Sequence, residues 1–295
     1  MSKHAYLVMA HNDWSLLSKL LRCIDDPRNA IYIHVDKKAF FPATEVYEPQ
    51  EAECSYIRRR NVSWGGYSQI VAELNLLEAA ITSEYDYYHL ISGQDLPIKS
   101  QDYIHDFFDN QSRENSYIGY SPKEVYSKMA MDRLGQYHFL QDSIGRNTGK
   151  WSNILRRFES KSLSIQRKLK VNRVAHYPFQ ICKGTNWFSI NHELAKYVVS
   201  RKKDIEKYFK HSKCADELFL QTITQDSPFK DKIIHNTLRA IDWKRGRPYT
   251  YRKEDFSLLI ESDKLFARKF STNVDLEIID MICAQINCNL KKGAQ

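Results

Sequence analysis

The first hundred residues alternate apolar runs of strand length with segments in which apolar residues recur every three or four positions. The runs His4–Ala10, Ile31–Val35 and Tyr87–Ser92 predict buried strands, and Cys54–Arg58 predicts a shorter one. Two helices are predicted between them from the following residues: Leu16, Leu17, Leu20, Leu21 and Ile24, and then Ile70, Val71, Leu74, Leu77 and Ile81. Strands that alternate with single helices predict an α/β fold, with a mostly parallel central sheet flanked by helices on both faces.

The pattern is less regular after residue 110, and we expect residues 110–180 to form the acceptor side. A strand over Gly184–Ile190 and helices beginning at Leu194 and Asp216 follow, and an amphipathic helix is predicted over Val274–Ile286. We expect one domain over residues 1–295. Residues 1–110 would form a nucleotide-binding half and residues 111–295 an acceptor-binding and catalytic half, with a basic helical insertion at about 145–175.

Polar or aromatic residues follow three of the predicted strands. Asp36 follows the second strand, the turn of Trp64, Gly65 and Gly66 follows the third, and Asp95 follows the fourth. Ligands bind at the carboxyl ends of the strands in sheets of this kind, so these residues are expected to meet at a nucleotide-type site. The alternative for Asp36 is a helix cap or a turn former, which is a frequent role of an acidic residue after a strand.

The chain contains no GxGxxG and no GxxxxGK[ST] motif, which argues against a dinucleotide-binding or P-loop enzyme. It also contains no Asp-x-Asp, a motif that holds a divalent metal ion against the diphosphate of a nucleotide in many sheets of this type. Positive charge for a diphosphate would therefore have to come from side chains rather than from a metal ion. Arg268 and Lys269 lie side by side between Phe266 and Phe270. They are candidates for neutralising a departing diphosphate, and the alternative is a basic pair on the surface.

Glu217 is the candidate catalytic base, because an inverting transfer needs a carboxylate to take the proton of the acceptor hydroxyl. Asp216 is expected to be the helix cap, and the alternative for both carboxylates is a favourable interaction with the helix dipole. Trp187 and Trp243 are candidates for stacking against sugar rings, although a single Trp is more often part of a core.

The net charge is +8, from 44 Lys and Arg and 36 Asp and Glu. Residues 150–173 hold eight Lys or Arg, interleaved with apolar residues, and Glu159 as their only acid. This segment is typical of a basic amphipathic helix at an anionic membrane or acceptor, and the alternative is a solvated insertion packed on the domain by one face. We find neither a membrane-spanning stretch nor a signal peptide, so we expect a cytoplasmic protein, peripheral at the inner membrane face. The six Cys form no CxxC pair and are expected to be reduced and mostly buried.

Seven segments in order resemble glycosyltransferase family 14, which holds the core-2 and I-branching β-1,6-N-acetylglucosaminyltransferases and the peptide O-xylosyltransferases. The segments span most of the chain and are His34 to Lys37, Trp64 to Gly66, Ser92 to Ile98, Gly184 to Phe188, Asp216 and Glu217, Leu238 to Trp243, and Phe266 to Phe270. The resemblance implies a GT-A fold, a UDP-sugar donor, inversion at the anomeric carbon, and no metal or other cofactor.

By matching position, the resemblance assigns a role to each candidate residue. Glu217 would be the catalytic base, and Arg268, Lys269 and Arg252 would bind the diphosphate, with Arg252 at a different spacing from Lys269 than in the vertebrate branching enzymes. The nucleotide would contact Asp36, Trp64 and Gly65, whereas the sugar and acceptor would contact the following residues: Asp95, Asn186, Trp187 and Trp243.

Two departures from the family bear on the acceptor and the source. Asn186 stands where the xylosyltransferases carry an acidic residue, and the Golgi anchor and paired cysteines of the animal members are not found. We therefore expect a bacterial enzyme of surface polysaccharide synthesis that transfers N-acetylglucosamine to a glycan or lipid-linked glycan. The alternatives are a non-catalytic sugar-nucleotide or carbohydrate-binding protein and, from charge alone, a nucleic-acid-binding protein, which no motif supports. A glycoside hydrolase would need a second carboxylate opposite Glu217, and the sequence does not place one.

Overall fold

The structure, a computed structural model, describes residues 2–290, with side chains except those of residues 124–127 and 287–290. Its strands form a seven-stranded sheet in the order β3-β2-β1-β4-β7-β6-β8 and a three-stranded sheet in the order β5-β10-β9. The strands are β1 His4–Ala10, β2 Asn29–Val35, β3 Glu53–Tyr56, β4 Tyr87–Ser92, β5 Asp95–Pro97, β6 Ser116–Tyr120, β7 Gly184–Asn191, β8 Ile233–Ile234, β9 Arg239–Ile241 and β10 Phe266–Arg268.

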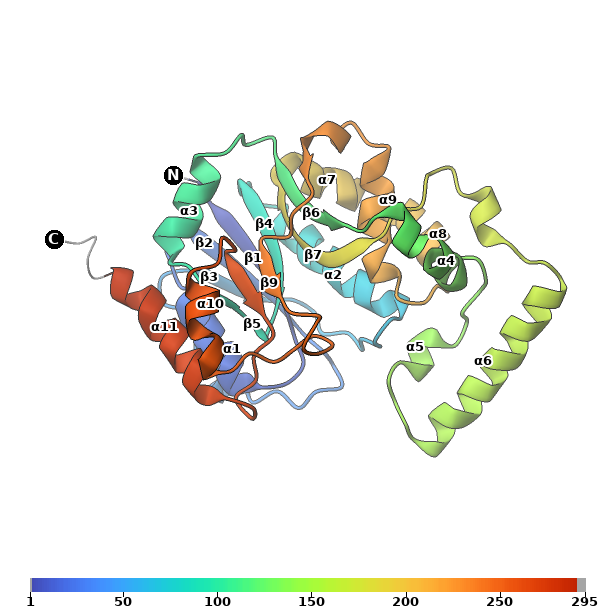
Figure 1. Ribbon diagram of the computed structural model, residues 1–295, viewed down its shortest axis with the longest axis horizontal. Helices are drawn as coiled ribbons and strands as arrows, with labels where there is room; N and C mark the ends of the chain where they lie inside the picture. Colours follow the sequence, from blue (N-terminus) through green and yellow to red (C-terminus); the bar gives the residue numbers. More distant parts are fainter. Residues whose placement is uncertain (1, 291–295) are drawn as a thin grey trace.

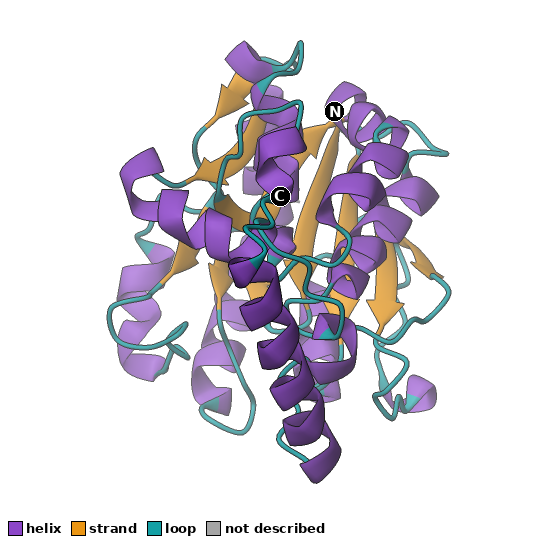
Figure 2. Cartoon of the chain, turned by 90° about the vertical axis from the view of Figure 1, so that its right-hand side faces the viewer, coloured by secondary structure: helices purple, strands orange, loops and turns teal. Residues whose placement is uncertain are grey.

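Helices lie on both faces of the large sheet (Figures 1 and 2). The α-helices are α1 Trp14–Cys23, α2 Tyr67–Ala80, α3 Gln101–Asp109, α4 Lys123–Leu134, α5 Gln141–Ile144, α6 Lys150–Lys168, α7 His192–Ser200, α8 Lys202–Phe209, α9 Phe219–Gln225, α10 Phe256–Ile260 and α11 Leu276–Leu290. Of these, α1, α3 and α11 share one face of the sheet with the small sheet, whereas α2, α7, α8 and α9 pack on the other face.

The central strand β1 shows why two separate cores form. Its side chains alternate, so that Tyr6, Val8 and Ala10 enter the core beneath α1 and α11, whereas Ala5 and Leu7 enter the core beneath α2. All five are buried, which explains why β1 reads as a continuous apolar run rather than as an alternating one.

The direction of the strands confirms the predicted α/β class with a mostly parallel sheet. Strands β3, β2, β1 and β4 are parallel neighbours, and β7 runs antiparallel to both β4 and β6. The carboxyl ends of β1, β2 and β4 therefore lie at one edge of the sheet, where Asp36 follows β2 and Asp95 follows β4 closely. The seven strands come from residues on both sides of position 110, and the division into two functional halves stays a prediction.

Arg239 holds the small sheet against the large one. Its buried guanidinium donates hydrogen bonds to the carbonyl oxygens of Leu90 in β4 (3.0 Å) and Phe188 in β7 (2.7 Å), and to Ser189 Oγ (2.9 Å). It also lies over the ring of Phe266, 4.9 Å from the ring centroid. Burial lowers the pKa of Arg239 to about 9, because the charged form is disfavoured away from water. The hydrogen bonds to the backbone carbonyls offset part of this cost.

The strand predictions agree with the structure within a few residues, whereas the helix predicted from Asp216 begins later. Residues Ala215–Glu217 form a short 3₁₀ helix (η3), and α9 starts at Phe219. Asp216 does not act as the expected cap because its buried carboxylate instead accepts a hydrogen bond from Gln69 Nε2 at 2.8 Å.

The basic segment is helical as predicted and forms α6. Cys23, Cys54, Cys182, Cys214 and Cys283 are free, and Cys288 lies outside the residues whose side chains are described. Within residues 2–290, no helix is both long enough and apolar enough to cross a bilayer.

The position of Arg239 leads to a stability prediction. Arg239→Met leaves two buried carbonyl oxygens without their donor, so we expect the free energy of unfolding to fall by about 3 kcal/mol. Urea unfolding followed by circular dichroism measures the change, with Lys244→Met, which removes an exposed cation close by, as the matched control. Equal stability of the two variants would contradict the role given to Arg239.

Candidate functional site

Arg268 is fixed at the carboxyl edge of the sheet by an ion pair. In the antiparallel pairing of β10 with β5, Arg268 lies directly opposite Asp95, and its Nη1 is 2.6 Å from Asp95 Oδ1. The guanidinium also donates to Ser92 Oγ and lies over the ring of Trp187 at 4.5 Å from the centroid. Asp95 is only 1% exposed, and its oxygens also accept from Ser92 N (2.8 Å) and Oγ (2.9 Å). Asp95 and Trp187 thus position Arg268.

Lys269 is half-buried, and its amine has no acidic partner within 4 Å in the part of the chain that the structure describes. Burial lowers the pKa of Lys269, and the charges of Arg268 and Arg146 lower it further. A cation surrounded by other cations and partly removed from water favours an anion beside it. His11, which follows β1, lies within electrostatic reach of Arg268, Lys269 and Asp36. We call His11, Arg146, Arg268 and Lys269 the basic cluster.

Trp64 joins the basic cluster to the rest of the site. The guanidinium of Arg146 lies over its ring, 4.0 Å from the centroid, and Trp64 keeps 45% of its surface exposed. The Trp64 carbonyl accepts a hydrogen bond from Gln141 Nε2 of α5 at 3.0 Å. A nucleotide that contacts Trp64, as predicted, would therefore share the indole ring with Arg146.

The two glycines after Trp64 lie so close to neighbouring residues that a Cβ would collide with them. A Cβ on Gly65, whose φ is +68°, would lie 2.8 Å from Cys214 Sγ, and a Cβ on Gly66 would lie 2.1 Å from Asp142 Oδ1. Cys214 N also donates to the Gly65 carbonyl at 2.7 Å. The Trp64 loop is therefore packed directly against the segment that leads into η3.

Asp36 acts as a turn former in the structure. Its Oδ1 accepts hydrogen bonds from the backbone N–H of Lys38 (3.0 Å) and of Val62 (3.3 Å), and Lys38 Nζ lies 3.8 Å from Oδ2. This was the alternative role for an acidic residue after a strand. These bonds hold the loop after β2 against the segment that precedes Trp64. Contact of Asp36 with a nucleotide stays a prediction.

Glu217 ends η3 and lies between two cations. Its Oε2 is 2.6 Å from Arg133 Nη1 and 3.1 Å from Lys183 Nζ. These partners lower the pKa of Glu217 against the opposing effect of burial, so the carboxylate stays ionised. Both contacts use Oε2, which leaves Oε1 without a hydrogen bond to the described residues. An ionised carboxylate with one open oxygen is suited to accept a proton.

Two further carboxyl groups, those of Glu73 and Asp216, are buried close to Glu217. Glu73 of α2 is fully buried, and burial raises its pKa, with the charge of Asp216 acting in the same direction. Burial also raises the pKa of Asp216 to about 7, with Glu217 contributing. The side chain of Asn186, a predicted sugar contact, lies beside Glu73. These two acids are therefore candidates for protonated carboxyls near neutral pH.

The remaining predicted residues lie at different distances from the basic cluster. Trp243 is exposed just past β9, which runs parallel to β10 with Ile241 opposite Arg268, so it shares the edge where Lys269 lies. Arg252 is exposed at the start of the short helix before α10, and its charge acts on Asp275 next to α11. Its role at a diphosphate stays a prediction. Arg133, Arg146 and Lys183 were missed because each is an isolated basic residue outside any motif.

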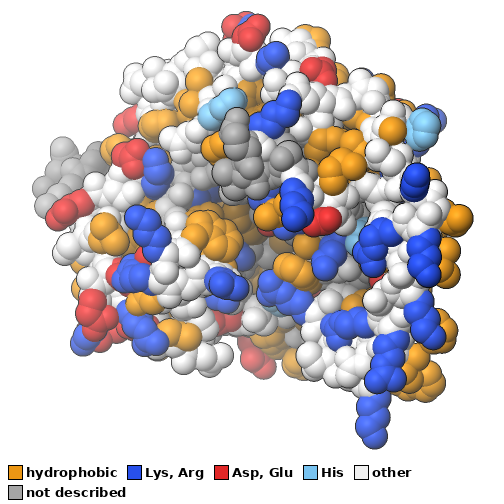
Figure 3. All heavy atoms as spheres, turned by 45° about the vertical axis from the view of Figure 1, so that its right-hand side comes forward, with side chains coloured by type: hydrophobic (Ala, Val, Ile, Leu, Met, Phe, Trp, Pro, Cys, Tyr) orange, Lys and Arg blue, Asp and Glu red, His pale blue; other side chains and the backbone are white. Residues whose placement is uncertain are grey.

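A series of contacts connects these groups. Glu217 comes three residues after Cys214, and Cys214 contacts Gly65. The neighbouring Trp64 stacks with Arg146, whose charge acts on Lys269. In the space-filling view, the face turned toward the viewer is hollowed near its middle, with Lys and Arg side chains around the hollow (Figure 3).

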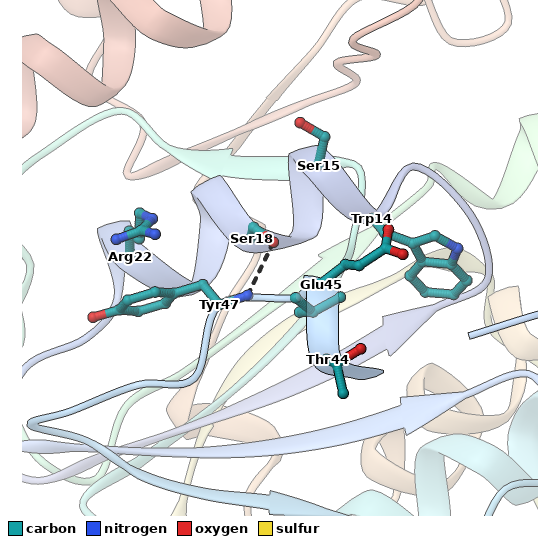
Figure 4. A pocket seen from close by; sticks show the side chains of 8 residues that line it. Trp14, Ser15, Ser18, Arg22, Thr44, Glu45 and Tyr47 are labelled. Carbon is teal, nitrogen blue, oxygen red and sulfur yellow. Dashed lines mark hydrogen bonds between the residues drawn. The ribbon is translucent and has the colours of Figure 1, made fainter. Parts of the chain in front are cut away.

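A separate cavity of about 480 Å³ lies between α1 and the segment after η1 (Ala43–Glu45) (Figure 4). Trp14, Ser18 and Arg22 line it from the helix, and Arg22 stacks over Tyr47 at 3.9 Å. No residue of the predicted site lines this cavity.

The raised pKa of Asp216 predicts a pH-dependent stability. The folded pKa of about 7 exceeds the unfolded value of about 4, so the favourable contribution of the protonated group is complete below pH 4 and is lost as the pH rises through 7. Asp216→Asn removes that loss. The stability of the variant relative to the parent should therefore increase between pH 4 and pH 8, as measured by urea unfolding. Asp231→Asn, at an exposed position, is the control, and the same pH trend in both variants would refute the assignment.

Comparison with known proteins identifies relatives among sugar-transferring enzymes. The chain is 24% identical over 298 residues to human N-acetyllactosaminide β-1,6-N-acetylglucosaminyl-transferase, covering 91% of this chain and 68% of that protein. It is 21% identical to rat xylosyltransferase 2 and 22% identical to human xylosyltransferase 1, covering 94% and 98% of this chain. The chain spans about a third of the length of these xylosyltransferases, 33% and 31%.

Among solved structures, mouse xyloside xylosyltransferase 1 in its apo form aligns over 89% of this chain and 97% of its own, with a TM-score of 0.36 and 11% identity. The sequence model of the Core-2/I-Branching enzyme family matches residues 4–259. The chain therefore belongs to the Core-2/I-Branching enzyme family.

Proposed function

We propose that the protein is an inverting, metal-independent glycosyltransferase of the GT-A type, which moves a sugar from a UDP-sugar to a hydroxyl of a glycan acceptor. The observation that carries the proposal is a pair of groups of opposite charge, which are connected by the series of contacts through Gly65, Trp64 and Arg146. One is Lys269, a cation that lacks an acidic partner among the described residues, and the other is Glu217, an ionised carboxylate with an open oxygen. Transfer from a nucleotide sugar needs both, because negative charge leaves with the diphosphate and a proton leaves the acceptor.

The basic cluster supports stabilisation of the leaving group without an ion bridging the phosphates. The charge of Arg268 is balanced by Asp95, so Arg268 supplies directed N–H groups more than net charge. Lys269 and Arg146 carry the net positive charge on this surface. As the bond from the anomeric carbon to the diphosphate oxygen breaks, these cations are suited to the negative charge that develops on that oxygen.

Glu217 supports the other half of the reaction. Its Oε1 accepts the proton of the acceptor hydroxyl while the hydroxyl oxygen bonds to the anomeric carbon from the face opposite the diphosphate, which inverts that centre. Arg133 and Lys183 hold the carboxylate through Oε2 and keep it ionised for this step. The products are the β-linked glycoside and UDP.

The proposed donor sugar is N-acetylglucosamine, in keeping with the name of the human relative, and a role in bacterial surface polysaccharide synthesis remains part of the proposal. A screen of UDP-sugars for hydrolysis by the protein identifies the donor. The competing function is a non-catalytic sugar-nucleotide-binding protein, which would bind UDP without turning over any donor.

Replacement of Glu217 separates these two functions. Glu217→Gln keeps the shape and removes the base, so we expect turnover to fall by about 10²- to 10⁴-fold while the affinity for UDP stays within a few-fold of the parent. Turnover is followed by UDP release and affinity by calorimetry. Glu193→Gln, at an exposed position on α7, is the matched control. Turnover unchanged in Glu217→Gln would refute the role of the base.

Replacement of Lys269 tests the charge that substitutes for a metal ion. Lys269→Met removes the unpaired cation, so we expect UDP to bind at least about tenfold more weakly, whereas Lys203→Met on the exposed face of α8 should leave the affinity unchanged. Turnover of the parent should persist in excess chelator. A strict requirement for manganese would contradict the proposed metal independence.

A further inference from the structure

Helix α6 packs on the body of the protein through polar side chains. Its buried residues are Ser152, Glu159 and Gln166, which recur at every seventh position and therefore lie along one side of the helix. Gln166 Oε1 accepts from Tyr137 N at 2.7 Å, and its Nε2 donates to the Tyr137 carbonyl at 2.9 Å. Glu159 Oε2 accepts from Leu140 N at 3.2 Å, and Oε1 lies 3.4 Å from His138 Nδ1.

Five large apolar side chains of α6 and its end point away from this contact, whereas Leu155 and Leu163 are half-buried beside it. Trp151 is 79% exposed and Leu169 is 71% exposed. We define the apolar stripe as the five exposed residues Trp151, Ile154, Phe158, Ile165 and Leu169. At 3.6 residues per turn, they fall within about 60° of one another around the helix axis. A surface helix normally turns such a stripe toward the core, whereas the stripe of α6 lies about 110° around the helix axis from the packed face.

Basic residues border the apolar stripe on the side away from the packed face. On the same helical geometry, Lys150, Arg157, Lys161 and Lys168 follow the stripe within about the next 60°, and all four are exposed. We call them the basic border. Glu159, the only acid between residues 150 and 173, is buried against the body. The outward side of α6 therefore presents apolar and positively charged groups without a negative charge.

The position of α6 leaves this side accessible to a large surface. The helix lies at the edge of the molecule, beyond α5 and away from both sheets (Figure 1). Lys and Arg side chains run along this edge, with hydrophobic side chains outside them (Figure 3). The apolar stripe is thus exposed on a helix at the edge of the molecule.

We propose that α6 is an interfacial membrane helix, which inserts the apolar stripe at the boundary of headgroups and acyl chains and sets the basic border against anionic lipid headgroups. A bilayer fits both features at once, because it offers apolar depth beneath negative charge. A second copy of the chain fits less well, since pairing two stripes would bring two basic borders together. This inference stands independently of the proposed reaction. If both hold, the acceptor is a glycan attached to lipid, presented beside the site.

Vesicle sedimentation with the full chain tests the proposal. The parent should bind vesicles of equal parts phosphatidylcholine and phosphatidylglycerol and should bind pure phosphatidylcholine at least about tenfold more weakly. Failure of the parent to bind the anionic vesicles would overturn the proposal.

Two variants separate insertion from attraction. Trp151→Ser with Phe158→Ser and Leu169→Ser should weaken binding to anionic vesicles at least about tenfold, because insertion of large side chains is lost. Arg157→Gln with Lys161→Gln and Lys168→Gln should weaken binding to anionic vesicles to a similar degree and leave binding to neutral vesicles unchanged. Binding equal to the parent in the first variant would overturn insertion, and in the second it would overturn the role of charge.

Matched controls change the same side chains elsewhere. Phe40→Ser with Leu258→Ser removes exposed apolar side chains, and Lys203→Gln with Lys207→Gln and Lys244→Gln removes exposed charges. Both controls should bind like the parent. All variants should keep the circular dichroism and the UDP affinity of the parent, because the altered side chains lie outside the core and the basic cluster. A parent that dimerises through the stripe and ignores vesicles would identify a second copy as the partner and overturn the proposal.

Discussion

The arrangement of the site depends on one buried cation between two sheets. Arg239, in β9 of the small sheet, donates hydrogen bonds to backbone carbonyls of β4 and β7 in the large sheet. These two strands are antiparallel neighbours. Through these hydrogen bonds the small sheet is seated against the large one. Strand β10 then pairs with both β9 and β5, which sets Arg268 and Lys269 at the carboxyl edge of β4.

Neighbouring cations at this edge have different electrostatic roles. Arg268 is neutralised by a buried carboxylate and stacked on an indole ring, so it is rigid and contributes little net charge. The pKa of Lys269 is lowered by burial and then by the charges of Arg268 and Arg146, and its amine has no acidic partner among the described residues. A site that holds one cation fixed and another uncompensated is preorganised for an anion, because the repulsion among the cations is relieved when the anion arrives.

The sequence predicted what depends on local pattern. Strand and helix positions in the first hundred residues follow from periodicity, and the polar residues at strand ends follow from the parallel sheet. It did not predict Arg146, Arg133 or Lys183, because single cations reach the site only through tertiary packing. The sequence also did not predict that Asp95 is buried against Arg268, since this contact depends on a pairing 173 residues away, and the sugar contact of Asp95 stays a prediction. The direction of α6 also escaped prediction, because its buried face is polar.

The glycines after Trp64 connect two parts of the site. Gly65 leaves no room for a side chain beside Cys214 and accepts a hydrogen bond from the Cys214 N–H, so the loop beneath the indole lies directly against the segment that leads to Glu217. A larger residue at position 65 would therefore disturb both the indole proposed to contact the nucleotide and the carboxylate proposed as the base, although it belongs to neither.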